Sequence, residues 1–152
     1  MLSLAHTLIS LPLAYYLEQP LLIFLAAVVG HFLCDSLLHW NLFHDQLRRG
    51  IFYLLVALDI GSGLVIAGLV VGSDIWTLPV LAAIIGGNLP DVLQQLYEKL
   101  RAAPRKKWLG WAAPAATWHD ALQLETTDPL RGLVSQALLS GLAVSLVLQQ
   151  IS

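Results

Sequence analysis

Five apolar stretches make up most of this chain, and short segments that are polar or contain proline or glycine separate them. Four of the stretches have the roughly 20 residues that an α-helix needs to cross the hydrocarbon layer of a bilayer, and the first stretch is shorter. The pattern predicts an all-α fold, a polytopic membrane helix bundle of about five spans, in a single domain over residues 1–152. The five predicted spans are 2–17, 21–40, 51–71, 75–96 and 130–151.

Helix-boundary signals lie where these stretches begin and inside one of them. Pro20 is typical of the first position of a helix, and Asp128, which precedes a proline, is typical of the N-cap of the last span. Within the fourth span, Gly86-Gly87 followed by Pro90 predicts a break or a kink at membrane depth.

Composition supports a membrane protein. Hydrophobic residues make up 57% of the chain and charged residues 12%, and the mean hydropathy is +0.72. An average soluble domain has about 25% charged residues. The only cysteine is Cys34, which excludes a disulfide within the chain and a zinc site made of several thiolates.

The basic residues lie on one side of the predicted bundle. All eight Lys and Arg fall in 41–50, in 97–129 or at Arg131. The positive-inside rule then places the N-terminus and both basic segments in the cytoplasm and the C-terminus outside. Tryptophans follow the second basic cluster, and Pro114 can open a short helix there. This combination favours an interfacial helix beside membrane lipid over a nucleic-acid patch.

The second span carries the candidate chemistry. His31, Asp35 and His39 follow one another at steps of four residues, so on a helix they form one stripe roughly 12 Å long. Imidazole and carboxylate groups bind zinc and similar divalent ions. The alternative is a set of core histidines that are hydrogen-bonded across helices beside a protonated Asp35.

Other ionisable residues agree with this stripe in depth, because His6, Asp91 and His119 are predicted in the same half of the bilayer. A lone Asp near the membrane centre costs roughly 2.5–3.5 kcal/mol, and no Lys or Arg lies within the apolar stretches to pair with one. A bound cation would lower this cost. We therefore expect His31, Asp35 and Asp91 to converge on a metal site, with His6 and His39 as further ligands.

Two more polar residues are expected behind this site. Asp59, in the third span, is predicted to orient a ligand histidine through its other ring nitrogen. Asn88, one turn before Asp91, can contact substrate or cap the helix after the predicted break.

The motifs "AHTLIS", "GHFLCDSLLHW", "GGNLPDVLQ" and "WHDALQ" resemble those of small prokaryotic inner-membrane proteins known as membrane-bound metal-dependent hydrolases. That family is grouped loosely with the zinc-dependent phospholipase C and nuclease helical fold. The resemblance implies a helical bundle with a His/Asp metal site that acts on a phosphoester or another membrane-associated substrate. The matching positions are His6, His31, Asp35, His39, Asp91 and His119.

The leading functional hypothesis is metal-assisted hydrolysis of a phosphoester or phospholipid-like substrate at the cytoplasmic face, with Asp35, Asp91 and His119 as catalytic groups. A divalent ion, zinc or else manganese or iron, would activate water and polarise a phosphoryl oxygen. The alternatives are a proton or metal-ion transporter, a non-catalytic membrane scaffold and a haem-binding bundle.

Overall fold

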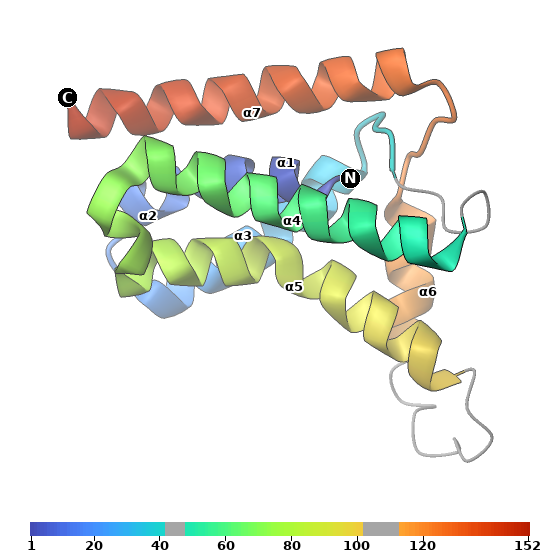
Figure 1. Cartoon of the computed structure of the whole chain (residues 1–152). Helices are drawn as coiled ribbons and strands as arrows, with labels where there is room; N and C mark the ends of the chain where they lie inside the picture. The colour runs from blue at the N-terminus through green and yellow to red at the C-terminus, as the bar shows by residue number, and fades with distance from the viewer. Residues whose placement is uncertain (42–47, 102–112) are drawn as a thin grey trace.

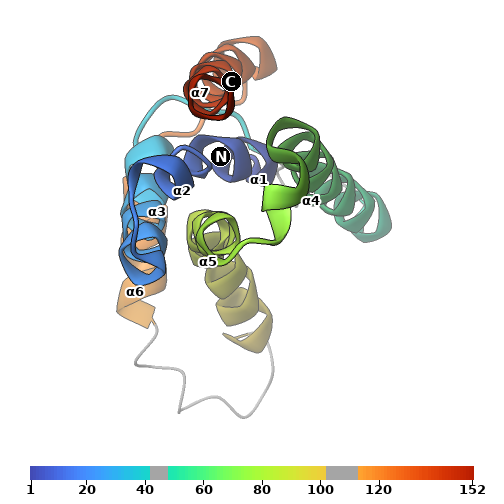
Figure 2. The same cartoon turned by 90° about the vertical axis from the view of Figure 1, so that its left-hand side faces the viewer.

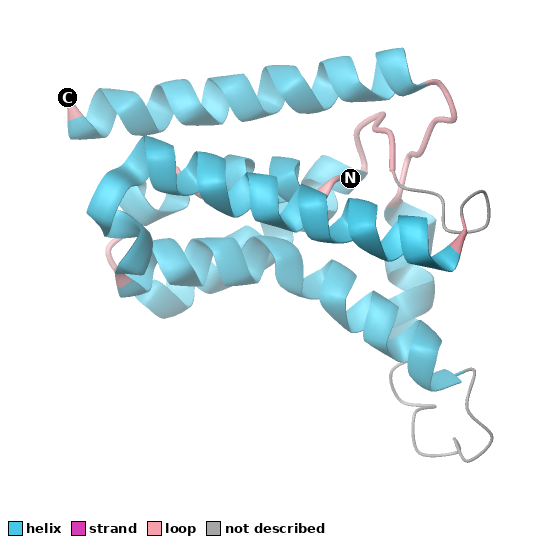
Figure 3. Cartoon of the chain, viewed as in Figure 1, coloured by secondary structure: helices cyan, strands magenta, loops and turns pink. Residues whose placement is uncertain are grey.

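A computed structural model of the chain describes residues 1–41, 48–101 and 113–152, and the described residues are helical, with no strand (Figures 1 and 3). The predicted all-α fold is therefore confirmed. The basic and tryptophan-containing stretch 102–112 and the connector 42–47 lie outside the described residues. The elements are α1 (Ser3–Ser10), α2 (Leu13–Tyr16), α3 (Pro20–Asp35), α4 (Arg49–Val71), the 3-10 helix η2 (Gly72–Trp76), α5 (Leu78–Arg101), α6 (Ala113–Leu122) and α7 (Pro129–Ile151).

The short helix α1 lies at the centre of the bundle. It contacts α3, α4, α5 and α7, which surround it when the bundle is viewed along its length (Figure 2). Two glycines allow this close approach. A Cβ atom added to Gly63 of α4 would lie 2.9 Å from Leu4 Cα, and one on Gly87 of α5 would lie 3.1 Å from the carbonyl oxygen of His6.

Within the part of the chain that the structure describes, two helices, and not about five, are long and apolar enough to cross a membrane. They are Gly50–Trp76, formed by α4 with η2, and Pro129–Ile151, which is α7. The first expected span is broken into α1 and α2, because Pro12 cannot continue a helix. The second is the 16-residue α3, about 24 Å long and so shorter than a hydrocarbon layer of about 30 Å. The fourth, α5, is long enough, but its second half is polar.

The end of α3 differs from the sequence-based prediction, and the middle of α5 decides between the two predicted alternatives, a break and a kink. Helix α3 was expected to continue to Trp40 but ends at Asp35, where backbone pairing with the segment after α6 replaces helical hydrogen bonds. The amide of Leu124 donates to the carbonyl of Asp35 at 2.8 Å, and the amide of His39 donates to the carbonyl of Leu124 at 3.1 Å. Helix α5 runs unbroken through Pro90 and bends in its middle (Figure 1). A kink, and not a break, is therefore observed.

The helix starts agree with their signals. Pro20 opens α3, and the Asp128 carboxylate accepts hydrogen bonds from the amides of Leu130 and Arg131 at the start of α7. The starts of α4 and α7 lie at the same end of the bundle, while η2 and the C-terminus lie at the opposite end (Figure 1).

Candidate metal centre

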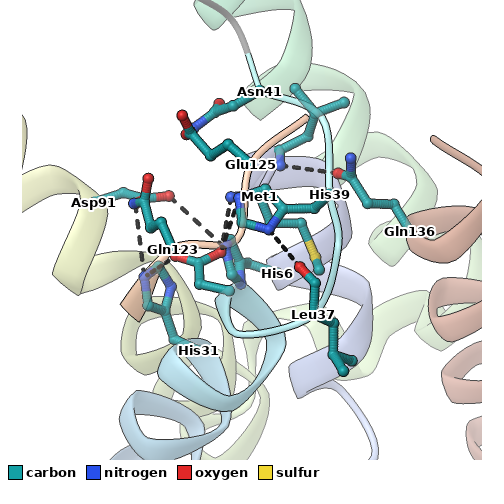
Figure 4. Close-up of polar contacts among 12 residues, drawn as sticks. Met1, His6, His31, Leu37, His39, Asn41, Asp91, Gln123, Glu125 and Gln136 are labelled. Atoms are coloured by element: carbon teal, nitrogen blue, oxygen red, sulfur yellow. Dashed lines mark hydrogen bonds and ion pairs between the residues drawn. The ribbon is translucent and has the colours of Figure 1, made fainter. Parts of the chain in front are cut away.

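Five segments of the chain bring the predicted residues together. Helix α1 supplies His6, α3 supplies His31 and Asp35, α5 supplies Asp91 and α6 supplies His119. His39 lies just after α3 and still reaches Asp35, although it is not on the helical stripe that the sequence predicted. The polar groups point toward one another between these segments (Figure 4).

Four of these residues have the arrangement of a metal-binding group. One ligand atom each from His31, Asp35, Asp91 and His119 lies within 4.8 Å of the other three. His31 Nε2 lies 3.0 Å from His119 Nε2, 3.2 Å from Asp35 Oδ2 and 3.6 Å from Asp91 Oδ1. His119 Nε2 lies 3.4 Å from each of the same two carboxylate oxygens. These separations match the edges of a tetrahedron, about 3.3 Å, around an ion with ligand bonds of about 2.0–2.1 Å.

The hydrogen bonds of His31 favour a cation at this point. Its Nδ1 lies 2.8 Å from the carbonyl oxygen of Gly87, which can only accept, so Nδ1 carries a proton. In neutral His31 the other nitrogen, Nε2, then presents a lone pair to the carboxylates of Asp35 and Asp91. Asp35 Oδ2 is buried and has no hydrogen-bond partner among the described residues. A bound cation would satisfy these groups.

The other oxygen of Asp35 faces a second set of groups. Oδ1 accepts from the N-terminal ammonium of Met1 at 2.7 Å and lies 3.2 Å from His6 Nε2 and 3.8 Å from His39 Nε2. His39 Nδ1 donates to the carbonyl of Leu37 at 2.8 Å, so its Nε2 also faces Asp35 as a lone pair when the ring is neutral. The carboxylate of Asp35 therefore lies at the centre of the whole cluster.

Aromatic packing holds the rings in place. The His6 and His31 rings stack with centroids 4.0 Å apart, and Phe32 packs edge-on against both His31 and His119. His6, His31, Asp35, His39 and His119 are buried, whereas 24% of the Asp91 side chain is exposed. Asp91 therefore marks the side from which solvent or substrate can approach.

Burial and the two carboxylates shift the ionisation of these groups in the metal-free state. Burial lowers the pKa of His6 to about 4. Burial would also lower the pKa of His31, but the neighbouring carboxylates of Asp35 and Asp91 outweigh it, so this pKa is raised. Burial would raise the pKa of Asp35, but the neighbouring imidazoles of His119, His31 and His6 hold it well below its usual range.

Two contacts of the α6 region hold His119 in the cluster, and no local sequence signal predicts either of them. Gln123 Nε2 lies 3.3 Å from His119 Nε2, and Gln94 of α5 donates to Asp120 of α6 at 2.8 Å.

A contact from α7 lies next to His39. Gln136 of α7 donates to the carbonyl of Trp40 at 2.7 Å. The sequence analysis assigned α7 no part in the site.

Asp59 of α4 and Asn88 of α5 lie beside the cluster, and their side chains contact α1. Asp59 accepts hydrogen bonds from the backbone amides of Ser3 and Leu4, and not from the ligand histidine that the sequence predicted. Asn88 donates to the hydroxyl of Thr7 at 3.0 Å and to the carbonyl of Ile84 at 2.8 Å. Both side chains therefore contact the helix that carries His6.

This arrangement could hold one divalent ion between three buried groups and a partly exposed carboxylate. His31, Asp35 and His119 would complete three positions, and Asp91 would be a fourth ligand or would face an open position. No family model, curated protein or solved structure matches the chain.

Proposed function

We propose that this chain is a membrane-bound metal-dependent hydrolase that acts on a phosphoester or phospholipid-like substrate at the cytoplasmic face of a prokaryotic inner membrane. The observation that carries the proposal is the convergence of His31, Asp35, Asp91 and His119 within 4.8 Å. The resemblance of the motifs around these residues to the membrane-bound metal-dependent hydrolases supports the same function.

Zinc is the ion that this donor set suits best. Two imidazole nitrogens and one or two carboxylate oxygens at tetrahedral separations are typical of zinc sites. Manganese or iron is the alternative if both carboxylates bind the ion and other oxygen ligands are added. When bound, a divalent ion lowers the pKa of a coordinated water to about 7 and polarises a phosphoryl oxygen.

The residues divide into those that hold the ion and one that faces the reactants. His31, Asp35 and His119 are buried, so they are placed to bind and orient the ion. Asp91 is the partly exposed member of the group, and its Oδ1 lies 3.4 Å from His119 Nε2. Asp91 is therefore the group placed to accept a proton from an attacking water, as a general base.

Lipid contact is supported by the outer faces of the helices. Leu58, Val65 and Leu69 of α4 are 59%, 62% and 80% exposed, and Leu138 of α7 is 69% exposed. We propose that α4 and α7 span the bilayer and that α3 is embedded beside them. Helix α3 turns an apolar row outward at four-residue steps, formed by Leu21, Leu25, Val29 and Leu33.

The competing functions make different demands on the same cluster. A haem iron held by two histidines needs the imidazoles on opposite faces of the porphyrin, whereas the rings of His31 and His119 stack with centroids 5.2 Å apart. A proton or metal-ion transporter would need polar groups through the whole bundle, but the buried polar residues gather at this one cluster and around α1. A non-catalytic membrane scaffold, the remaining alternative, would not need a bound ion in this cluster.

Replacing Asp91 by Asn tests the proposal. The variant should keep its divalent ion, because His31, Asp35 and His119 remain, and should lose hydrolysis of a chromogenic phosphodiester and of phospholipid in mixed micelles. The matched control is Asp74→Asn, which changes a carboxylate that accepts from Tyr15 away from the cluster. If the metal-loaded wild type hydrolyses neither substrate, the hydrolase proposal fails. Ion flux into liposomes would then favour transport.

A further inference from the structure

The two candidate membrane-spanning helices each direct one polar side chain at the same turn of α1. From α4, Asp59 Oδ2 accepts from the amide of Ser3 at 2.8 Å, and Asp59 Oδ1 accepts from the amide of Leu4 at 3.2 Å. From α7, Gln136 Oε1 accepts from the amide of Leu2 at 3.0 Å. Three consecutive backbone amides are therefore bound by two different helices.

These bonds supply a cap that the sequence of α1 lacks. The first amides of a helix have no acceptor within the helix, and Leu2, at the N-cap position, makes no side-chain capping bond. The negative charge of Asp59 also lies at the positive end of the α1 dipole. Contacts from α4 and α7, and not the sequence of α1 itself, thus fix where α1 begins.

The position of α1 matters because His6 lies one turn after this cap. His6 Nε2 is 3.2 Å from Asp35 Oδ1, and the His6 ring stacks on His31. A shift of the first turn of α1 would therefore move His6 relative to two members of the metal centre.

Gln136 has a second contact in the same region. Its Nε2 donates to the carbonyl of Trp40 at 2.7 Å, and Trp40 follows His39. The Gln136 side chain is buried, with 4% of the residue exposed. One buried amide thus links α7 both to the start of α1 and to the segment that carries His39.

We propose that Asp59 and Gln136 are positioning residues that set His6 against Asp35 through the first turn of α1. In this way they couple the two candidate membrane helices to the metal centre. The inference rests on the metal centre of the proposed function. It also gives a physical reason for a carboxylate in the apolar body of α4, because a charged group there is costly unless it has partners.

A double-mutant cycle on metal affinity tests this coupling. Asp59→Leu, His6→Ala and the double variant are compared with wild type by competition with a chelator for Zn²⁺ and by the visible absorption of bound Co²⁺. We expect Asp59→Leu to lower Zn²⁺ affinity about 10-fold, the lower end of what a displaced outer contact costs. In the His6→Ala background the same change should have little further effect, because its influence passes through His6. Asp59→Asn keeps one acceptor and should fall in between.

Matched controls and a stability measurement separate positioning from a general structural role. Ser62→Ala removes a hydroxyl that bonds only within α4, and Ser140→Ala removes a buried hydroxyl of α7 one turn from Gln136. Neither control should change Zn²⁺ affinity, whereas Gln136→Leu should lower it. Metal-free Asp59→Leu should unfold near the wild-type temperature, because the lost cap is offset by removing a carboxylate from an apolar helix.

Three results would overturn the inference. An equal loss of affinity in the wild-type and His6→Ala backgrounds would show that Asp59 does not act through His6. Unchanged affinity and Co²⁺ absorption in Asp59→Leu would refute the positioning role while leaving the metal centre intact. A wild-type protein that binds no divalent ion would refute the proposed function and this inference together.

Discussion

The Nε2 atoms of His31 and His119 lie 3.0 Å apart, although 88 positions separate the two residues in the chain. Both nitrogens also face Asp35 Oδ2 and Asp91 Oδ1. Such a meeting of two imidazole nitrogens and two carboxylate oxygens is what a shared ion requires.

The two histidines should therefore act as one unit. His31→Ala and His119→Ala should each weaken Zn²⁺ binding by more than the 10–100-fold that loss of an outer hydrogen bond costs. The double variant should bind Zn²⁺ more weakly than either single one, since two ligands of the same ion are then missing. Chelator competition measures all three affinities. His44→Ala, at the one histidine outside the described residues, is the control, and an unchanged affinity in either single variant would contradict a shared ion.

Packing between α3 and α5 gives a prediction about stability. A Cβ atom at Gly86 would lie 2.5 Å from the carbonyl oxygen of Phe24, so Gly86→Ala must push α3 and α5 apart. We expect it to lower the free energy of unfolding by about 1–3 kcal/mol, as overpacking usually does. Gly61→Ala is the matched control, because no described atom lies within 4 Å of its added Cβ. Denaturant titration in detergent compares the two, and equal stabilities would show that α3 and α5 are not in close contact.

The lowered pKa of His6 gives the metal-free protein a pH-dependent stability. The unfolded chain takes up this proton near pH 6.5, but the folded chain does so only near pH 4. Stability from this residue is therefore full above about pH 6.5 and is lost as the pH falls to about 4, by about 3 kcal/mol. The measurement is the free energy of unfolding of wild type and of His6→Gln from pH 7 to pH 4, in the presence of a chelator. Over this range wild type should lose about 3 kcal/mol more stability than His6→Gln. A constant difference would mean that His6 is not buried as a neutral ring.

The distribution of basic residues predicts the orientation in the membrane. Arg48 precedes α4 and Arg131 lies in the first turn of α7, and these two helix starts share one end of the bundle (Figure 1). Reporter fusions at residue 103 should therefore be active on the cytoplasmic side, and fusions in 72–76 on the outer side. An externally active reporter at residue 103 would contradict the proposed topology.

Much of the candidate site could be predicted from the sequence, because ionisable residues in apolar stretches are few. His6, His31, Asp35, Asp91 and His119 were singled out by residue type and depth alone, and the structure brings them together. The starts of α3 and α7 also followed from local signals, since proline at the first turn and aspartate at the N-cap act within a few residues.

The end of α3 and the role of Gln136 depend on tertiary contacts, which local sequence signals do not indicate. Helix α3 ends at Asp35 because residues 124–126 pair with its end, and nothing near Ser36 encodes that pairing. In the sequence, Gln136 is an isolated polar residue in an apolar stretch. Its role follows only from its hydrogen bonds to the backbone of Leu2 and Trp40, which are distant in the chain. The first predicted span was wrong for a reason visible in the sequence, since Pro12 divides that apolar stretch.

The central claim is that Asp35 binds a divalent ion together with His31 and His119, with Asp91 beside it. The most direct measurement is the metal content of purified wild type and of Asp35→Asn, after expression and purification with divalent ions present. Asp74→Asn is the control, because its carboxylate accepts from Tyr15 away from the cluster. We predict a stoichiometric ion in wild type and in the control, and none in Asp35→Asn. A wild type without bound ion, or an Asp35→Asn protein that keeps a stoichiometric ion, would contradict the claim.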